Sequence, residues 1–241
     1  MKVSRQSQIR LAYRVTRSEE VMRFPADFLQ VSVFWGWPNA METMLRTVEA
    51  CRSLAIPYVI HPVEYPLSEL RPERRKIVME DLSVMAAKTD LALIVHDETA
   101  KGGKRLSGES SDAYREALLQ LTRLCPVSIE NATNSHDVKW FWSEYAQSIT
   151  LDIGHLELAG IDSVEYVSTL EPEYLARVEY VHMHRVNGVR GGIRDHWGLV
   201  EGCRELAALK SLTARKEGLG VILEVIEPED TKKSLDLLNN L

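Results

Sequence analysis

Residues 149–184 of the chain read ITLDIGHLELAGIDSVEYVSTLEPEYLARVEYVHMH. Two short runs that are rich in apolar and β-branched residues, 149–154 and 178–184, stand at the two ends of this stretch. Residues 162–177 between them have helical spacing, and Pro172 predicts a break there because proline removes a helical hydrogen bond. A strand, a helix and a second strand in this order indicate a βαβ unit with parallel strands.

The same alternation continues in both directions from this unit. Short apolar runs predict eight strands, at residues 9–15, 28–35, 58–61, 91–96, 127–131, 149–154, 178–184 and 220–225. Several of them are apolar on consecutive residues, which is typical of parallel strands that are covered on both faces. Helical spacing predicts helices at residues 39–54, 71–87, 110–123, 136–146, 162–177, 200–216 and 228–241, and a small helix at most within 17–24.

Eight strand–helix units predict an α/β fold, namely a single (β/α)₈ TIM barrel over residues 1–241 with a short first helix. The alternative is an open, doubly wound parallel sheet. It is less favoured because no glycine-rich phosphate-binding fingerprint follows the first strand.

Composition limits the class of protein and its partners. The chain is 45% hydrophobic and 27% charged, which is enough apolar surface for a packed core. No apolar run approaches the roughly 18 residues of a membrane span, and the start MKVSRQSQIR is too polar for a signal peptide. Cys51, Cys125 and Cys203 are widely spaced, which favours a reducing, cytoplasmic location over a disulfide framework. The net charge of −6 disfavours a nucleic-acid partner.

Most of the histidines follow the predicted strands. Six of seven lie at a strand's carboxyl end or in the loop after it: His61, His96, His155, His182, His184 and His196. Carboxylates occupy similar places at Glu130, Asp152 and Glu224. Carboxyl ends of barrel strands meet at one mouth, and buried charges are unfavourable unless they are paired or bind a cation.

Nitrogen and carboxylate ligands in one place suit zinc or manganese, with magnesium or cobalt as alternatives. A single histidine at a strand end is more often a structural residue. The combination on several strands therefore carries the prediction of a divalent-metal centre. His184 is the weakest candidate, because it follows His182 by two residues and could instead support a ligand.

Four motifs resemble the metal-binding motifs of the xylose isomerase-like TIM-barrel superfamily, which contains sugar isomerases, epimerases and type-IV apurinic-site endonucleases. They are IENATN (129–134), LDIGHLELAG (151–160), VHMHRVNG with RDHWGLVEG (181–202) and ILEV (222–225). The resemblance extends over about residues 58–225.

The epimerase pattern of this superfamily implies one metal ion, held by Glu130, Asp152, His182 and Glu224. It implies that Glu130 and Glu224 transfer protons on opposite faces of the substrate carbon. It also implies substrate contacts from His155 and from a basic residue of the following loop, which is Arg185, Arg190 or Arg194. Trp197 is expected to line the pocket.

The endonuclease pattern implies more ions. His61 and His96 would bind a first ion with Glu130 as a bridge, and Asp152, His182 and Glu224 a second. His155 and His196, with an aspartate near Asp195, would bind a third. The chain departs from that pattern at Arg194, where the pattern has an aspartate.

The sequence therefore predicts a cytoplasmic, divalent-metal-dependent isomerase or epimerase of a small sugar or sugar derivative, with no membrane partner. A homo-oligomer is left open. The first alternative is a multi-metal phosphodiesterase related to the apurinic endonucleases, and the second is a catalytically inactive barrel that binds a ligand. KGGKRLSG (101–108) could hold a phosphate, although a solvated surface loop is the preferred interpretation.

Overall fold

The computed structural model describes residues 9–187 and 195–241, and in them eight parallel strands close into a barrel in chain order. The strands are β1 Ile9–Val15, β2 Phe28–Phe34, β3 Tyr58–Val63, β4 Leu93–His96, β5 Val127–Glu130, β6 Ser148–Asp152, β7 Val178–Met183 and β8 Leu219–Leu223. The TIM-barrel prediction is confirmed. No helix of the described residues is long and apolar enough to cross a membrane.

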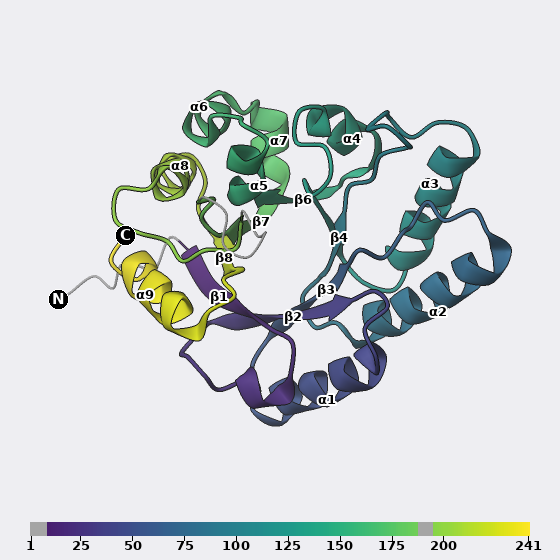
Figure 1. The fold of residues 1–241 in the computed structure, drawn as a ribbon, viewed down its shortest axis with the longest axis horizontal. Helices are drawn as coiled ribbons and strands as arrows, with labels where there is room; N and C mark the ends of the chain where they lie inside the picture. Colours follow the sequence, from purple (N-terminus) through teal and green to yellow (C-terminus); the bar gives the residue numbers. More distant parts are fainter. Residues whose placement is uncertain (1–8, 188–194) are drawn as a thin grey trace.

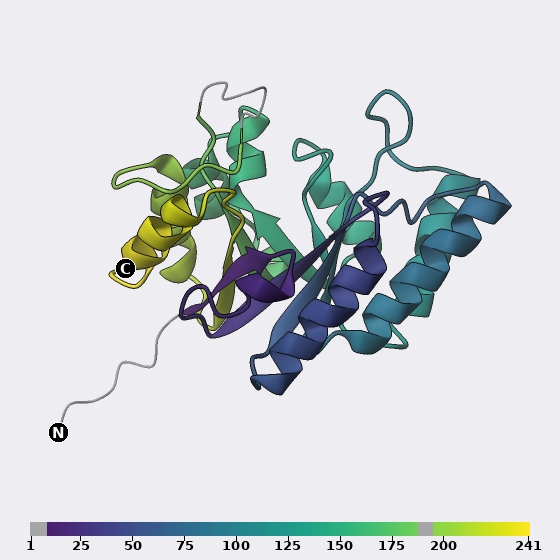
Figure 2. The same cartoon turned by 60° about the horizontal axis from the view of Figure 1, so that its bottom comes forward.

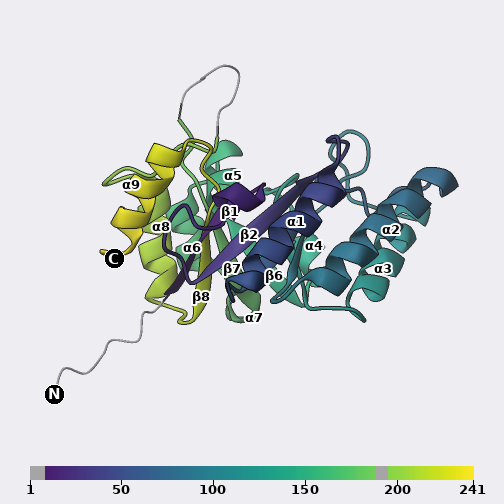
Figure 3. The same cartoon turned by 90° about the horizontal axis from the view of Figure 1, so that it is seen from below.

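The helices form an outer ring around the strands (Figure 1). They are η1 Ser18–Glu20, α1 Ala40–Ser53, α2 Pro72–Lys88, α3 Glu109–Leu121, α4 Val138–Tyr145, α5 Ile153–Leu158, α6 Ser163–Thr169, α7 Pro172–Arg177, α8 Arg204–Thr213 and α9 Pro228–Leu238. Helices α1, α2 and α3 lie side by side on one flank (Figure 2), and α8 and α9 on the opposite flank (Figure 3). The short first helix is the 3₁₀ turn η1.

The interior of the barrel is divided into two layers. At the amino end of the strands it is filled by a small apolar cluster that includes Ala12, Phe28, Val59, Ile94, Tyr180 and Ile222. Side chains alternate across a strand, so the residue two positions further along points into the same interior. In β2 that residue is Gln30, and in β8 the position two beyond Ile222 is Glu224. The carboxyl-end layer of the interior is therefore polar.

The strand predicted at 149–154 is too long at its carboxyl end. β6 ends at Asp152, and α5 begins at the next residue. The side chain of Asp152 accepts a hydrogen bond from the backbone N–H of His155 at 2.7 Å, which is the usual contact of a helix N-cap. The predicted break at Pro172 is confirmed, because it separates α6 from α7.

Candidate metal centre

Four buried side chains from adjacent strands converge at the carboxyl end of the barrel. Glu130 and Asp152 end β5 and β6, His182 lies in β7, and Glu224 directly follows β8. Each residue is at most 3% exposed. Their potential ligand atoms all lie within 4.8 Å of one another. The strand register brings Asp152 opposite His182, and we call these four residues the quartet.

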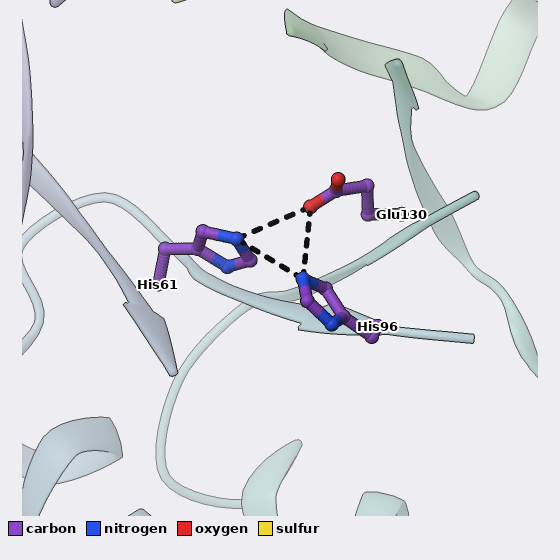
Figure 4. Close-up of side chains that lie close together, drawn as sticks. All are labelled: His61, His96 and Glu130. Atoms are coloured by element: carbon purple, nitrogen blue, oxygen red, sulfur yellow. Dashed lines mark hydrogen bonds and ion pairs between the residues drawn. The ribbon is translucent and has the colours of Figure 1, made fainter. Parts of the chain in front are cut away.

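A second group shares Glu130 with the quartet. His61 lies in β3 and His96 ends β4, and their Nε2 atoms are 3.2 Å apart. Oε2 of Glu130 lies 3.3 Å from His61 Nε2 and 3.6 Å from His96 Nε2. Figure 4 shows these three side chains turned toward one another. We call His61, His96 and Glu130 the trio.

Several polar atoms at the junction of the two groups have no hydrogen bond. Both carboxylate oxygens of Glu130 and Nδ1 of His182 are buried and lack a hydrogen-bond partner among the described residues. The Nδ1 atom of His182 lies 3.2 Å from Oε2 of Glu130, which is close enough for attraction but without hydrogen-bond geometry. A buried polar atom without a partner costs about 1–3 kcal/mol. These nitrogen and oxygen atoms therefore fit a divalent cation.

Hydrogen bonds on the far side of two rings direct the other nitrogen of each ring at the centre. His61 Nδ1 lies 2.9 Å from the carbonyl oxygen of Ile94, which can only accept, so Nδ1 carries the hydrogen. His182 Nε2 lies 2.7 Å from Oε1 of Gln30 and donates to it in the same way. When the rings are neutral, His61 Nε2 and His182 Nδ1 are the atoms that offer a lone pair to a cation. This arrangement is the usual support of a metal-binding histidine.

His155 and His196 follow the same rule. His155 Nδ1 lies 3.1 Å from the carbonyl oxygen of Asn131, and His196 Nδ1 lies 2.8 Å from that of Glu224. Each ring therefore keeps a free Nε2. The His155 and His196 side chains are 15% and 22% exposed, so they border the open side of the centre.

The charges of the centre shift one another's pKa values. Burial alone would raise the pKa of Glu130, but the neighbouring imidazoles, His182 first, hold it well below its usual range. The same balance lowers the pKa of Glu224. Burial alone would lower the pKa of His182, but the carboxylates of Glu130 and Glu224 raise it to about 9. Burial lowers the pKa of His96 to about 4, which leaves this ring neutral and able to bind a cation at pH 7.

Gln30 belongs to the site, although the sequence analysis did not include it. Its Oε1 accepts from His182, and its Nε2 donates to Oε1 of Glu224 at 2.5 Å and to Oγ of Ser32 at 3.2 Å. The available signal was a polar residue inside the apolar run FLQVSVF, on the same strand face as Phe28. Gln30 thus orients two members of the quartet at once.

Asn131 and Asp97 were also missed. Asn131 is hydrogen-bonded to the backbone of Asp152 in both directions, with Nδ2 donating to the carbonyl at 2.9 Å and Oδ1 accepting from the N–H at 2.8 Å. Buried Asp97 accepts from backbone N–H groups of residues 132–134, directly after Asn131. Both residues fix the loop after β5 against its neighbours. In sequence, Asn131 lies in the predicted strand 127–131 and in the motif IENATN but has no predicted role, and Asp97 directly follows the predicted strand 91–96.

The remaining predicted residues lie around the mouth. Asp195 Oδ2 is 4.0 Å from His196 Nε2, which is beyond hydrogen-bonding distance. The backbone of Trp197 pairs with that of Arg185, through bonds of 2.9 and 3.2 Å. Arg190 and Arg194 lie outside the described residues.

The basic loop 101–108 lies after β4, and its basic side chains are either paired within the chain or exposed to solvent. Arg105 forms an ion pair with Asp137 and lies over the ring of Trp140, 4.7 Å from its centroid. Lys101 and Lys104 are exposed. This arrangement is consistent with a solvated surface loop.

Comparisons with known proteins place the fold. No protein-family model matches the chain, and no curated protein matches it in sequence. Among solved structures, a D-tagatose 3-epimerase-like protein matches with a TM-score of 0.68 at 17% identity, over 96% of this chain and 98% of the other. Endonuclease IV from Thermus thermophilus matches with a TM-score of 0.63 at 17% identity, with the same coverage.

A D-psicose 3-epimerase from Clostridium cellulolyticum, solved with D-tagatose, matches with a TM-score of 0.56 at 10% identity, over 96% of this chain and 98% of the other. Epimerases and an endonuclease thus share this architecture, and identities this low bear on the fold alone. The chain is a TIM barrel whose fold is similar to that of these epimerases and of endonuclease IV.

Proposed function

We propose that this chain is a divalent-metal-dependent hydrolase of phosphate esters, with two ions bridged by Glu130. The observation that carries the proposal is the environment of Glu130 Oε2. This one oxygen lies 3.3, 3.6 and 3.2 Å from the ring nitrogens of His61, His96 and His182. A buried carboxylate between a histidine pair and a separate carboxylate-rich group is the arrangement expected of a ligand that two ions share.

The trio would hold one ion and the quartet the other. Two imidazole nitrogens in the trio favour zinc over magnesium or calcium. When bound, such ions lower the pKa of coordinated water and stabilise negative charge on a phosphoryl oxygen. The chain's own contribution is to fix the ligands through Gln30 and Asn131. The Nε2 atoms of His155 and His196 are left facing the open side, where they can accept a hydrogen bond from a substrate hydroxyl or from water.

Proton transfer by Glu130 and Glu224 is less well supported by the same contacts. Glu130 is buried, and its Oε2 faces three imidazoles. Oε1 of Glu224 is held by Gln30 at 2.5 Å. These contacts hold both carboxylates in a fixed position. A fixed position suits a metal ligand better than a base that must approach a substrate carbon.

The second candidate is the sugar isomerase or epimerase that the sequence favours. The quartet supports it, because these four residues could hold a single ion without the trio. His155 lies on the open side of the quartet, where a substrate hydroxyl would be expected. In this case His61 and His96 would be dispensable for metal binding.

Metal content and turnover separate the candidates. The purified protein should contain more than one zinc per chain and hydrolyse bis(p-nitrophenyl) phosphate or an apurinic-site duplex. One ion per chain together with interconversion of ketohexoses would establish the second candidate instead. If no ion is retained and a chelator leaves thermal stability unchanged, the inactive ligand-binding barrel is the correct interpretation.

A matched pair of variants tests the trio directly. His61→Gln should remove one ion and most of the hydrolysis. His136→Gln is the control, because His136 is exposed and outside both groups. Equal metal content in the two variants would contradict the bridged centre.

A further inference from the structure

His184 lies among the candidate ligands, directly after β7. It is completely buried, and its Nε2 is 3.2 Å from Oδ1 and 3.3 Å from Oδ2 of Asp152. Distance alone groups it with Asp152 and His155 as a possible metal site. Its hydrogen bonds indicate a different role.

Unlike the rings of His155, His182 and His196, the ring of His184 uses both of its nitrogens in hydrogen bonds. The backbone N–H of His196 donates to Nδ1 of His184 at 3.1 Å. An N–H group can only donate, so Nδ1 uses its lone pair in this bond. The hydrogen of the neutral ring is then on Nε2, where it is donated to Asp152. Neither nitrogen of His184 is left with a lone pair for a cation, whereas His61, His155 and His196 carry the hydrogen on Nδ1 and have the lone pair on Nε2.

The surroundings of His184 are built to hold the ring in this position. The backbone pair between Arg185 and Trp197 places His196 beside it, and His196 adopts a left-handed backbone with φ of 59°. Gly154, in the first turn of α5, faces the ring. A Cβ atom at residue 154 would lie 2.2 Å from Cε1 of His184, so only glycine leaves room for the imidazole.

We propose that His184 is a positioning residue, which holds Asp152 for metal binding and is not itself a ligand. The N–H of His155 donates to Oδ1 of Asp152 at 2.7 Å, and Nε2 of His184 donates to Oδ2 at 3.3 Å and lies 3.2 Å from Oδ1. The same Oδ2 lies 3.9 Å from Nδ1 of His182, so the bond from His184 fixes the oxygen that borders the centre. The inference rests on the proposed metal centre. It implies that the ions are those of the trio and the quartet, with none added by His184.

Two substitutions of His184 distinguish a residue that positions Asp152 from a residue that binds the metal ion itself. The amide nitrogen of His184→Gln can replace Nε2 as a donor to Asp152, whereas His184→Ala removes the donor. Loss of such a supporting contact typically weakens metal affinity by roughly 10–100-fold. In zinc titrations we expect His184→Ala to keep the wild-type number of ions with affinity reduced by that factor, and His184→Gln to stay within a few-fold of wild type.

His61→Gln is the matched ligand control and should lose one ion. If His184→Gln lost an ion as His61→Gln does, His184 would be a ligand and the proposal would be wrong. Gly154→Ala offers an independent route, because its methyl group displaces an intact His184 ring. It should weaken zinc affinity about as much as His184→Ala, and the double variant should be no worse than His184→Ala alone. An additive loss in the double variant would contradict the proposal.

Nitrogen-15 NMR of histidine-labelled wild-type protein gives a test that needs no variant to fold. In the metal-free protein, His184 should show a protonated Nε2 and an unprotonated Nδ1. After loading with ¹¹³Cd, coupling to cadmium should appear for His61 and His182 and be absent for His184. Coupling to His184 would overturn the inference. Failure of the wild type to bind cadmium or zinc would refute the proposed function, while the ring's protonation pattern would still be measured.

Discussion

The two layers inside the barrel are formed by the same strands but differ in chemistry. The apolar layer lies at the amino ends of the strands and the polar layer at their carboxyl ends. Phe28 and Gln30 lie two positions apart on β2 and face the same interior, but one packs in the apolar layer and the other orients buried charges. The apolar layer gains stability from burial. The polar layer holds carboxylates and imidazoles that are unfavourable to bury without a cation. The residues that stabilise the fold and the residues of the candidate site are thus two positions apart along the same face of a strand.

Glu130→Gln should produce the largest effect in the polar layer. The substitution removes the charge that both proposed ions share, so both should be lost and hydrolysis should fall by about 1,000-fold or more. The fold should persist, because the apolar layer is untouched. Metal analysis and circular dichroism of the same sample check both expectations. Retention of both ions would show that Glu130 is not a bridge.

Phe28→Ala is the counterpart in the apolar layer. Phe28 is 1% exposed and packs against Tyr180, with ring centroids 6.1 Å apart. Truncating a buried phenylalanine destabilises a protein by about 3–5 kcal/mol. Urea unfolding should show a loss of this size, while the folded protein binds the same number of ions as the wild type. If the folded Phe28→Ala protein lost ions in the absence of urea, the two layers would be coupled.

This division explains which features the sequence could predict. Runs such as LALIVH and VSIE combine apolar side chains that predict a buried strand with a terminal His96 or Glu130 that predicts the site. The strand ends could be predicted because the polar residue interrupts the run of apolar residues. Gln30 also interrupts a pattern, but an amide inside a strand has no specific chemistry until its partners are known. The roles of Asn131 and His184 depend on hydrogen bonds to residues 21 and 12 positions away, which no local pattern encodes.

Gln30→Met sharpens the boundary between the layers. Methionine keeps the volume of the side chain but removes the bonds to His182 and Glu224. We expect zinc affinity of the quartet to fall by roughly 10–100-fold, since supporting contacts to ligands typically have this effect. Ser32→Ala is the control, because Ser32 contacts Gln30 alone among these residues. A Gln30→Met protein with wild-type affinity would exclude Gln30 from the centre.

Per pH unit, the smallest expected effect is the dependence of metal binding on pH. Burial would lower the pKa of His182, but Glu130 and Glu224 raise it to about 9, so a proton occupies this ring in the metal-free protein at pH 7. An ion that uses Nδ1 must displace that proton. Zinc affinity of the quartet should therefore fall about tenfold for each pH unit below about 9 and level off above it, and calorimetry in two buffers should find about one proton released at pH 7.

The metal-free protein should show the linked effect on stability. A pKa raised from 6.5 to about 9 means that protonated His182 stabilises the fold, fully below pH 6.5 and no longer above about pH 9. The free energy of unfolding of the metal-free protein, measured with urea, should accordingly decrease as the pH rises through this window. Its zinc affinity should increase over the same window. His96, with a pKa of about 4, contributes to neither change between pH 6.5 and 9. Affinity and stability that rise together with pH would place the displaced proton elsewhere than on His182.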